Sequence, residues 1–292
     1  MGPELLIKIL SHLSLKGLYR LGDYVVYPLM YYVVRYRRRI VRDNLTLSFP
    51  DKSKAEIVRI EKQFYHHFAD VMMEIIRNYR IGNEEVMERM VFENTDEMEQ
   101  WSKGKKGVIM MLGHIGNWEW VPIVVKSFQD PQMKGYFVYR RLKNPNTDRL
   151  MLAMREQRSG KGSSIEKNDL IRKMIALIHS DQRFTLGLIS DQKVSPKNVY
   201  YRTEFLHQDT SFLGGGEVLA RKMDLTVTYL HIRETSRGYY RARFELLSSD
   251  APNTEKGEIT ELFARKLEED ILAQPHLWLW THNRWKWERA KQ

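Results

Sequence analysis

Residues 113–119 (GHIGNWE) bring a histidine and a carboxylate into one short stretch of chain. His114 and Glu119 are five positions apart, so on one regular helix they would point about 140° away from each other. The glycines at 113 and 116 allow a sharp turn instead. With His114 in that turn and Glu119 at the start of a helix, the carboxylate can approach the imidazole. The spacing therefore predicts a general base, His114, oriented by Glu119; the alternative is a His–Glu pair with a structural role only.

The elements around this pair place it at the edge of a sheet. The run 107–112 (GVIMML) is short, continuous and apolar, which is typical of a buried strand, and residues 118–126 can follow as a helix. Strands and helices then alternate, which predicts an α/β fold with a mixed, largely parallel central sheet covered by helices. The carboxyl ends of such strands are where α/β proteins bind their ligands. The predicted strands are 108–112, 136–139, 185–189, 225–232 and 239–246, and the predicted helices are 118–126, 147–158, 169–179, 217–222 and 258–273.

Two further polar clusters follow predicted strands. Strand 136–139 leads into Arg140 and Arg141 and then into the turn residues Asn144 and Pro145. These cations would face the same edge as His114, although a solvated basic loop has the same composition. Asp191 follows strand 185–189 in the same way.

Several mechanisms have no support in the sequence. The chain has no cysteine, which excludes a thiol nucleophile and thiolate metal sites. It has no GxSxG elbow, no Walker-type or GxGxxG loop and no HExxH motif. We therefore expect a reaction without a covalent enzyme intermediate, a metal or an organic cofactor.

The N-terminal part of the chain indicates contact with a membrane. Residues 21–34 are apolar but carry Asp23 and Pro28, and the stretch is shorter than the ~20 residues of a spanning helix. A basic cluster follows, which suits the headgroup region. We expect shallow insertion by an anchoring segment, 1–42, ahead of a catalytic domain, 43–292; the alternative is a core helix with a solvated basic end. The cluster contains Arg35, Arg37, Arg38, Arg39 and Arg42.

The net charge of +10 favours anionic partners, among them an acidic carrier protein, phosphate groups or a membrane surface. Four tryptophans between positions 278 and 287 alternate with basic residues. They suit an interfacial rim or an aromatic–basic binding surface. The other interpretation is a segment that packs its indoles in the core.

Taken in order, these motifs resemble the late acyltransferases of lipid A biosynthesis, in the lysophospholipid acyltransferase superfamily. That family carries a GHxGNWE box, a YRxxxNPxxD block, an Asp-Gln pair after a strand, and a C-terminal WxWxHxRxK run. An Asn-Leu…Phe-Pro stretch after the N-terminal apolar segment is shared as well. The matching residues are 113–119; Tyr139, Arg140, Asn144, Pro145 and Asp148; Asp191 and Gln192; Trp278, Trp280, His282, Arg284 and Lys286; and Asn44, Leu45, Phe49 and Pro50. Arg141 replaces the family's usual proline, and residues 204–208 replace its usual Phe-Phe-Gly stretch.

The resemblance implies a membrane-associated O-acyltransferase. Its donor would be an acyl-carrier-protein thioester and its acceptor a phosphorylated lipid A precursor, at the cytoplasmic face of the inner membrane of a Gram-negative-type bacterium. His114 and Glu119 would be catalytic. Substrate binding or positioning would fall to Asn117, Arg140, Asn144, Asp148 and Asp191.

Two other functions fit the same residues. The acceptor could be another membrane lipid, such as a lysophospholipid, an aminolipid or a glycosylated phosphatidylinositol. A protein of a different class, a non-catalytic basic protein that binds membranes or nucleic acid, would also use the arginines and tryptophans. It would leave the His–Glu pair unexplained, so we expect no nucleic-acid partner.

Overall fold

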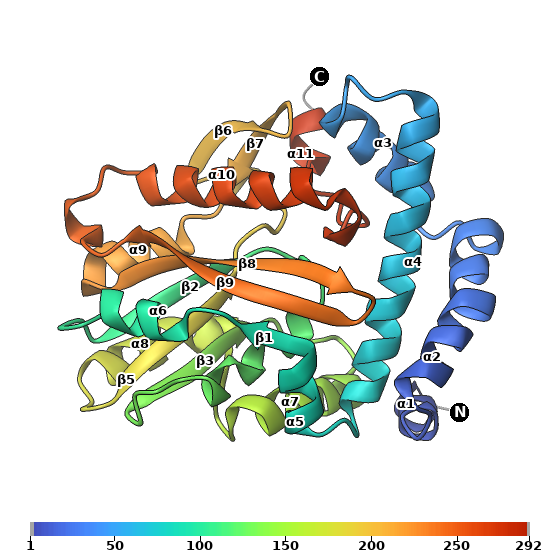
Figure 1. Cartoon of the computed structure of the whole chain (residues 1–292). Helices are drawn as coiled ribbons and strands as arrows, with labels where there is room; N and C mark the ends of the chain where they lie inside the picture. Colours follow the sequence, from blue (N-terminus) through green and yellow to red (C-terminus); the bar gives the residue numbers. More distant parts are fainter. Residues whose placement is uncertain (1–2, 291–292) are drawn as a thin grey trace.

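The centre of the computed structural model is a seven-stranded sheet with the strand order β1-β9-β8-β2-β5-β3-β4 (Figure 1). The structure describes residues 3–290. Within the sheet β8 and β9 are antiparallel and the other neighbouring strands are parallel, so the predicted mixed, largely parallel α/β fold is confirmed. Its strands are β1 (Met90–Phe92), β2 (Gly107–Leu112), β3 (Met133–Tyr139), β4 (Ser164–Glu166), β5 (Arg183–Ile189), β8 (Thr226–Ser236) and β9 (Tyr239–Ser248).

Strand β2 lies at the middle of the sheet because both of its faces are apolar. Every residue of β2 is buried, and the strand pairs with β5 on one side and β8 on the other. A continuous apolar run of this kind is what a parallel strand covered on both faces requires. A separate antiparallel hairpin is formed by β6 (Tyr201–Phe205) and β7 (Gln208–Phe212).

Helices cover both faces of the sheet (Figure 1). In the view of Figure 1, α9 and α10 lie above the sheet, α5 and α7 lie below it, and α4 runs along one side. The α-helices are α1 (Pro3–Leu10), α2 (Leu15–Leu21), α3 (Arg38–Ser48), α4 (Lys54–Asn78), α5 (Asn83–Arg89), α6 (Thr95–Trp101), α7 (Pro145–Ser159), α8 (Leu170–Ile178), α9 (Gly215–Met223), α10 (Glu258–Ala273) and α11 (Lys286–Arg289). Short 3-10 helices are η3 (Trp118–Lys126), η4 (Lys167–Asp169), η5 (Pro196–Asn198), η6 (Ala251–Asn253) and η7 (Pro275–Leu277).

The helix that follows the GHIGNWE segment differs from the expected one. Residues 118–126 form the 3-10 helix η3. Pro122 lies inside it and has no N–H to donate, which weakens a regular α-helical hydrogen-bond ladder. The chain in η3 is therefore wound more tightly than an α-helix, which changes where the side chains near its start point.

The N-terminal segment folds as short helices against α4. After α2 come two π-helical turns, η1 (Gly22–Val26) and η2 (Leu29–Val33), on either side of Pro28. The side chains of Leu18 and Tyr31 are buried in the same core as the sheet residues, whereas Tyr24 is 80% exposed and Val33 72% exposed. Across residues 3–290, no helix has both the length and the apolar character needed to cross a bilayer.

Part of the basic cluster at 35–42 has a structural role. The guanidinium groups of Arg38 and Arg42 both bind the carboxylate of Glu61, which is fully buried on α4. Arg37 donates to the backbone carbonyl of Thr281 at 3.0 Å. These contacts fasten α3 to α4 and to the C-terminal segment, so only the remaining cations of the cluster are available to a partner.

Arg158 of α7 joins this helix to the end of α4, and we expect its loss to destabilise the fold. Its side chain is fully buried and donates to the side chains of Asn78 and Asn83 and to the carbonyls of Asn78 and Ile81. Arg158→Ala would leave these buried acceptors unpaired and lower the free energy of unfolding by about 3 kcal/mol, measured by urea denaturation. The matched control is Arg149→Ala, at an exposed position of the same helix. Equal stability of the two variants would contradict this interpretation.

Candidate active site

His114 lies in a turn at the carboxyl end of β2, and the turn is held by the C-terminal segment. The amide of Gly116 donates to the carbonyl of Leu277 at 3.1 Å, and the amide of Leu279 donates to the carbonyl of His114 at 3.1 Å. Gly116 has a φ of +57°, which glycine adopts without strain. At Gly113 a β-carbon would lie 2.5 Å from Cδ1 of Leu267, so any other residue there would require the buried side chain of Leu267 to shift.

The carboxylate of Asp191 binds the imidazole of His114. One oxygen lies 2.6 Å from Nδ1 of His114, and the other accepts the backbone amide of His114 at 2.9 Å. The indole N–H of Trp278 donates to that second oxygen at 2.8 Å. Asp191 follows β5 and His114 follows β2, and because the two strands are parallel neighbours their carboxyl ends meet at one edge of the sheet. With Nδ1 bound to the carboxylate, Nε2 is left to accept a proton.

The environment raises the pKa of His114 above its usual 6.5. Burial acts to lower this pKa, but the charge of Asp191, its hydrogen bond to the ring and the charge of Glu119 outweigh burial. For Asp191, burial acts to raise the pKa, yet the charge and hydrogen bonds of His114 and the bond from Trp278 hold it well below its usual range. Asp191 is therefore ionised and stabilises the imidazolium that forms when His114 takes up a proton.

Glu119 does not occupy the place that the sequence predicted for it. Both of its carboxylate oxygens bind the guanidinium of Arg155 on α7, at 2.8 and 2.6 Å. The prediction that Glu119 orients His114 is therefore wrong. The carboxylate that binds the imidazole is that of Asp191. The reason is the path of η3, which carries Glu119 toward α7. Glu119 still lines the same cavity as His114.

His114 lines a cavity of about 360 Å³ whose walls contain both apolar and polar residues. This volume lies in the range of small-ligand pockets. The apolar lining comes from Leu112, Val121, Pro122, Phe137, Val138, Leu170, Leu188, Ile189 and Leu213, and the polar lining includes His114, Glu119, Arg140, Arg155, Lys167, Ser190 and Gln192. Gly215 and Gly216, at the start of α9, also line it. Gly214 is the N-cap residue of α9, so three consecutive glycines begin this helix at the wall of the cavity.

The structure brings some of the other predicted residues to this cavity and not others. Arg140 lines it and has no hydrogen bond or ion pair with the rest of residues 3–290. Asn144 caps α7 by accepting the amides of Asn146 and Thr147. Asp148 accepts the amide of Leu142 at 2.7 Å. Asn144 and Asp148 therefore shape the loop that carries Arg140.

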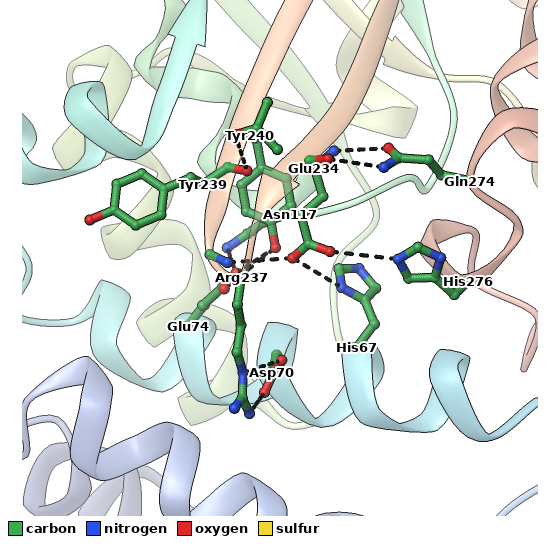
Figure 2. Close-up of polar contacts among 12 residues, drawn as sticks. His67, Asp70, Glu74, Asn117, Glu234, Arg237, Tyr239, Tyr240, Gln274 and His276 are labelled. Atoms are coloured by element: carbon green, nitrogen blue, oxygen red, sulfur yellow. Dashed lines mark hydrogen bonds and ion pairs between the residues drawn. The ribbon is translucent and has the colours of Figure 1, made fainter. Parts of the chain in front are cut away.

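Asn117 is fully buried beside Glu74 (Figure 2) and is not among the residues that line the cavity. Its amide group donates to the carboxylate of Glu74 on α4 at 2.8 Å, and the hydroxyls of Tyr19 and Tyr240 donate to the same carboxylate at 2.7 and 3.1 Å. Burial raises the pKa of Glu74 to about 7, although these hydrogen bonds act to lower it. Asn117 thus fastens the turn of His114 to α4 and α2.

The C-terminal tryptophans pack in the core, which decides between the two interpretations of that run. Trp278, Trp280 and Trp285 are buried, and only Trp287 is partly exposed. Sequence patterns did not identify Arg155 as a site residue, since nothing in its local sequence marks it. The sequence also did not predict the hydrogen bond from Trp278 to Asp191, because nothing in the run of tryptophans indicates which indole N–H would bind a carboxylate.

A comparison with protein families agrees with this geometry. The model of the bacterial lipid A biosynthesis acyltransferase family matches residues 7–287. The chain belongs to this family. Membership indicates acyltransferase activity with a lipid acceptor. No curated protein matches the chain significantly.

Asp191→Asn is expected to slow acyl transfer and to change its pH dependence. A general base must be unprotonated to act, so if His114 has this role we expect the rate to fall as the pH drops below the pKa of His114. Without the Asp191 charge that pKa decreases, and the acidic limb of the kcat/KM profile moves to lower pH. We also expect a loss in kcat/KM of about 10²-fold or more. The control Asp181→Asn removes an exposed charge just before β5 and should change neither quantity.

Glu119→Gln separates the two candidate partners of His114. Because Glu119 binds Arg155 and its charge is the smallest contribution to the raised pKa of His114, the acidic limb should move less than in Asp191→Asn. The rate should still fall, since Arg155 loses its anchor. A shift of the limb larger than that of Asp191→Asn would restore Glu119 as the orienting residue.

Proposed function

We propose that this protein transfers a fatty acyl chain from an acyl-carrier-protein thioester to a hydroxyl of a phosphorylated lipid A precursor. The observation that carries the proposal is the His114–Asp191 pair, with His114 in the wall of a cavity that has many apolar lining residues, in a chain of the lipid A acyltransferase family. The apolar lining suits an acyl chain. The polar lining suits the reacting groups and the phosphates of the acceptor.

In the proposed reaction the general base is Nε2 of His114, the ring nitrogen that Asp191 does not bind. Nε2 takes the proton of the acceptor hydroxyl while the oxygen attacks the thioester carbonyl. The tetrahedral intermediate collapses, the carbon–sulfur bond breaks, and the imidazolium returns the proton to the leaving thiolate. The products are an ester and the free carrier-protein thiol, and the charge of Asp191 stabilises the imidazolium throughout.

Cations and backbone amides around the cavity are suited to the negative charge that develops. Arg155 is held in place by both oxygens of Glu119, whereas Arg140 is free of partners in the described part of the chain. A fixed guanidinium suits the oxyanion, and a free one suits a substrate phosphate. The start of α9, where Gly215 and Gly216 have no side chains to cover the backbone, provides further donors at the wall.

Exposed apolar side chains and the net charge support the proposed contacts with a membrane and with an acyl carrier protein. Exposed apolar side chains of α1, η1 and η2 would lie in the interface, at the cytoplasmic face of the inner membrane. The net charge of +10 favours association with an acidic carrier protein and with anionic lipids. The exposed residues are Leu5, Leu6, Ile9, Tyr24, Val25, Leu29, Tyr32, Val33 and Val34.

The test is the mass change of a lipid A precursor incubated with the protein and acyl-carrier-protein thioester. The wild type should add one acyl group, and His114→Ala should lower the rate by about 10²–10⁴-fold because the base is lost. His179→Ala, at an exposed histidine after α8, is the matched control and should retain full activity.

The proposal is wrong if the wild type adds no acyl group, or if His114→Ala adds it as fast as the wild type does. If the lipid A precursor stays unmodified while a lysophospholipid or an aminolipid gains the acyl chain, the acceptor assignment is wrong and the mechanism stands. Mass spectra of lipid extracts from a strain that lacks the protein would show which lipid loses its chain.

A further inference from the structure

A second cavity, of about 610 Å³, lies along the outer face of α4 and shares no lining residue with the cavity of His114. Its walls come from α4, from the end of β8 with the turn that follows, from η7 and from the N-terminal segment. The lining residues are Tyr27, Ala55, Val58, Arg59, Lys62, Gln63, His66, His67, Asp70, Glu234, Arg237 and His276.

Two cations of this pocket form no ion pair with its carboxylates. Arg237, by contrast, is shared between two carboxylates: it binds Asp70 through Nε at 2.7 Å and Asp23 at 2.7 Å. Arg59 and Lys62 are exposed on the same face of α4, and neither forms an ion pair with any residue between 3 and 290. Their ammonium and guanidinium groups are free for an anionic ligand.

The inner end of the pocket holds two imidazoles around one carboxylate (Figure 2). Glu234 lies 4.0 Å from Nδ1 of His67 and 3.6 Å from Nε2 of His276. His67 is buried, yet neither of its ring nitrogens has a hydrogen-bond partner in the described structure. A buried polar group without a partner is costly, and a ligand in the pocket would supply one. A carboxylate that faces one nitrogen of each ring holds the hydrogen on that nitrogen, so the other nitrogen of a neutral imidazole is a hydrogen-bond acceptor.

The N-terminal segment places this pocket at the border of the exposed apolar surface. The ring of Tyr27 stacks on His66 with centroids 3.7 Å apart. Tyr24 lines an adjoining depression together with His66 and Asp70 and is itself 80% exposed. An occupant would therefore have its polar part against α4 and its apolar part beside η1 and η2.

We propose that this pocket binds the phosphate of an anionic phospholipid headgroup, at a site separate from the acceptor and donor. The proposal rests on the membrane association given under the proposed function. Arg59 and Lys62 pair with the phosphate, the remaining ring nitrogens of His67 and His276 accept hydrogen bonds from hydroxyls of the headgroup, and the acyl chains lie along the exposed apolar residues. A free phosphate ion would satisfy the cations but would leave the apolar border without a role.

Vesicle binding tests the site. Wild-type protein should bind phosphatidylcholine vesicles more tightly when they contain phosphatidylglycerol. The variant Arg59→Gln/Lys62→Gln should lose about tenfold or more of this gain, since each cation near an anionic surface contributes a several-fold effect. The control Lys103→Gln/Lys222→Gln removes the same charge at exposed positions outside the pocket and should lose much less. His276→Ala, which removes a partly exposed imidazole, should also lower the gain.

A second experiment, with soluble ligands, distinguishes a lipid headgroup from free phosphate. Short-chain phosphatidylglycerol below its micelle concentration should raise the Tm of the wild type and leave that of Arg59→Gln/Lys62→Gln unchanged. Inorganic phosphate at the same concentration should have little effect.

Three results overturn the proposal: equal stabilisation by inorganic phosphate, equal losses for the two double variants, or no preference of the wild type for phosphatidylglycerol. Acyl transfer to a detergent-solubilised acceptor is measured alongside and should be unchanged in all pocket variants. If acyl transfer is absent from every protein, the proposed function fails while the binding results remain interpretable.

Discussion

The buried carboxylate of Asp191 is the group on which the arrangement of the active site depends. An ionised carboxylate out of contact with water is stable only when its oxygens are fully hydrogen-bonded. Asp191 obtains its donors from the ring and the backbone of His114 and from the indole of Trp278. The end of β2, the end of β5 and the C-terminal segment must therefore meet at one place. The burial of the C-terminal tryptophans is one consequence of this requirement.

The same C-terminal segment connects the turn that carries His114 to the N-terminal part of the chain. Asn44 on α3 donates to the carbonyls of Trp280 and His282, and Arg37 donates to the carbonyl of Thr281. On the other side of the turn, Asn117 reaches Glu74, which also accepts the hydroxyl of Tyr19 on α2. The N-terminal segment is thus attached to the turn of His114 by buried polar contacts on two sides. A segment that only anchored the chain to a membrane would not need them.

Much of the fold followed from local sequence, whereas the partner of His114 did not. The strand at 107–112 and the helix at 258–273 were predicted because each has a consistent apolar pattern over its whole length. The short elements β1, β4, α5 and α6 carry too few residues for a pattern. Glu119 was chosen as the partner because it is near His114 in the sequence. Asp191 is 77 residues away, and its contact depends on β2 and β5 being neighbours in the sheet.

Asp191 binds His114 whereas Glu119 binds Arg155, and this arrangement suits a histidine base that works near neutral pH. A general base is most effective when its pKa is close to the working pH. Asp191 already raises the pKa of His114 against the effect of burial. A second carboxylate bound to the ring would raise it further and keep more of the imidazole protonated and inactive. Arg155 occupies both oxygens of Glu119, which limits that effect and fixes a guanidinium at the wall of the cavity, where negative charge would develop in the proposed reaction. The residue that is closest in sequence is therefore more useful to the reaction when it holds an arginine than when it holds the histidine.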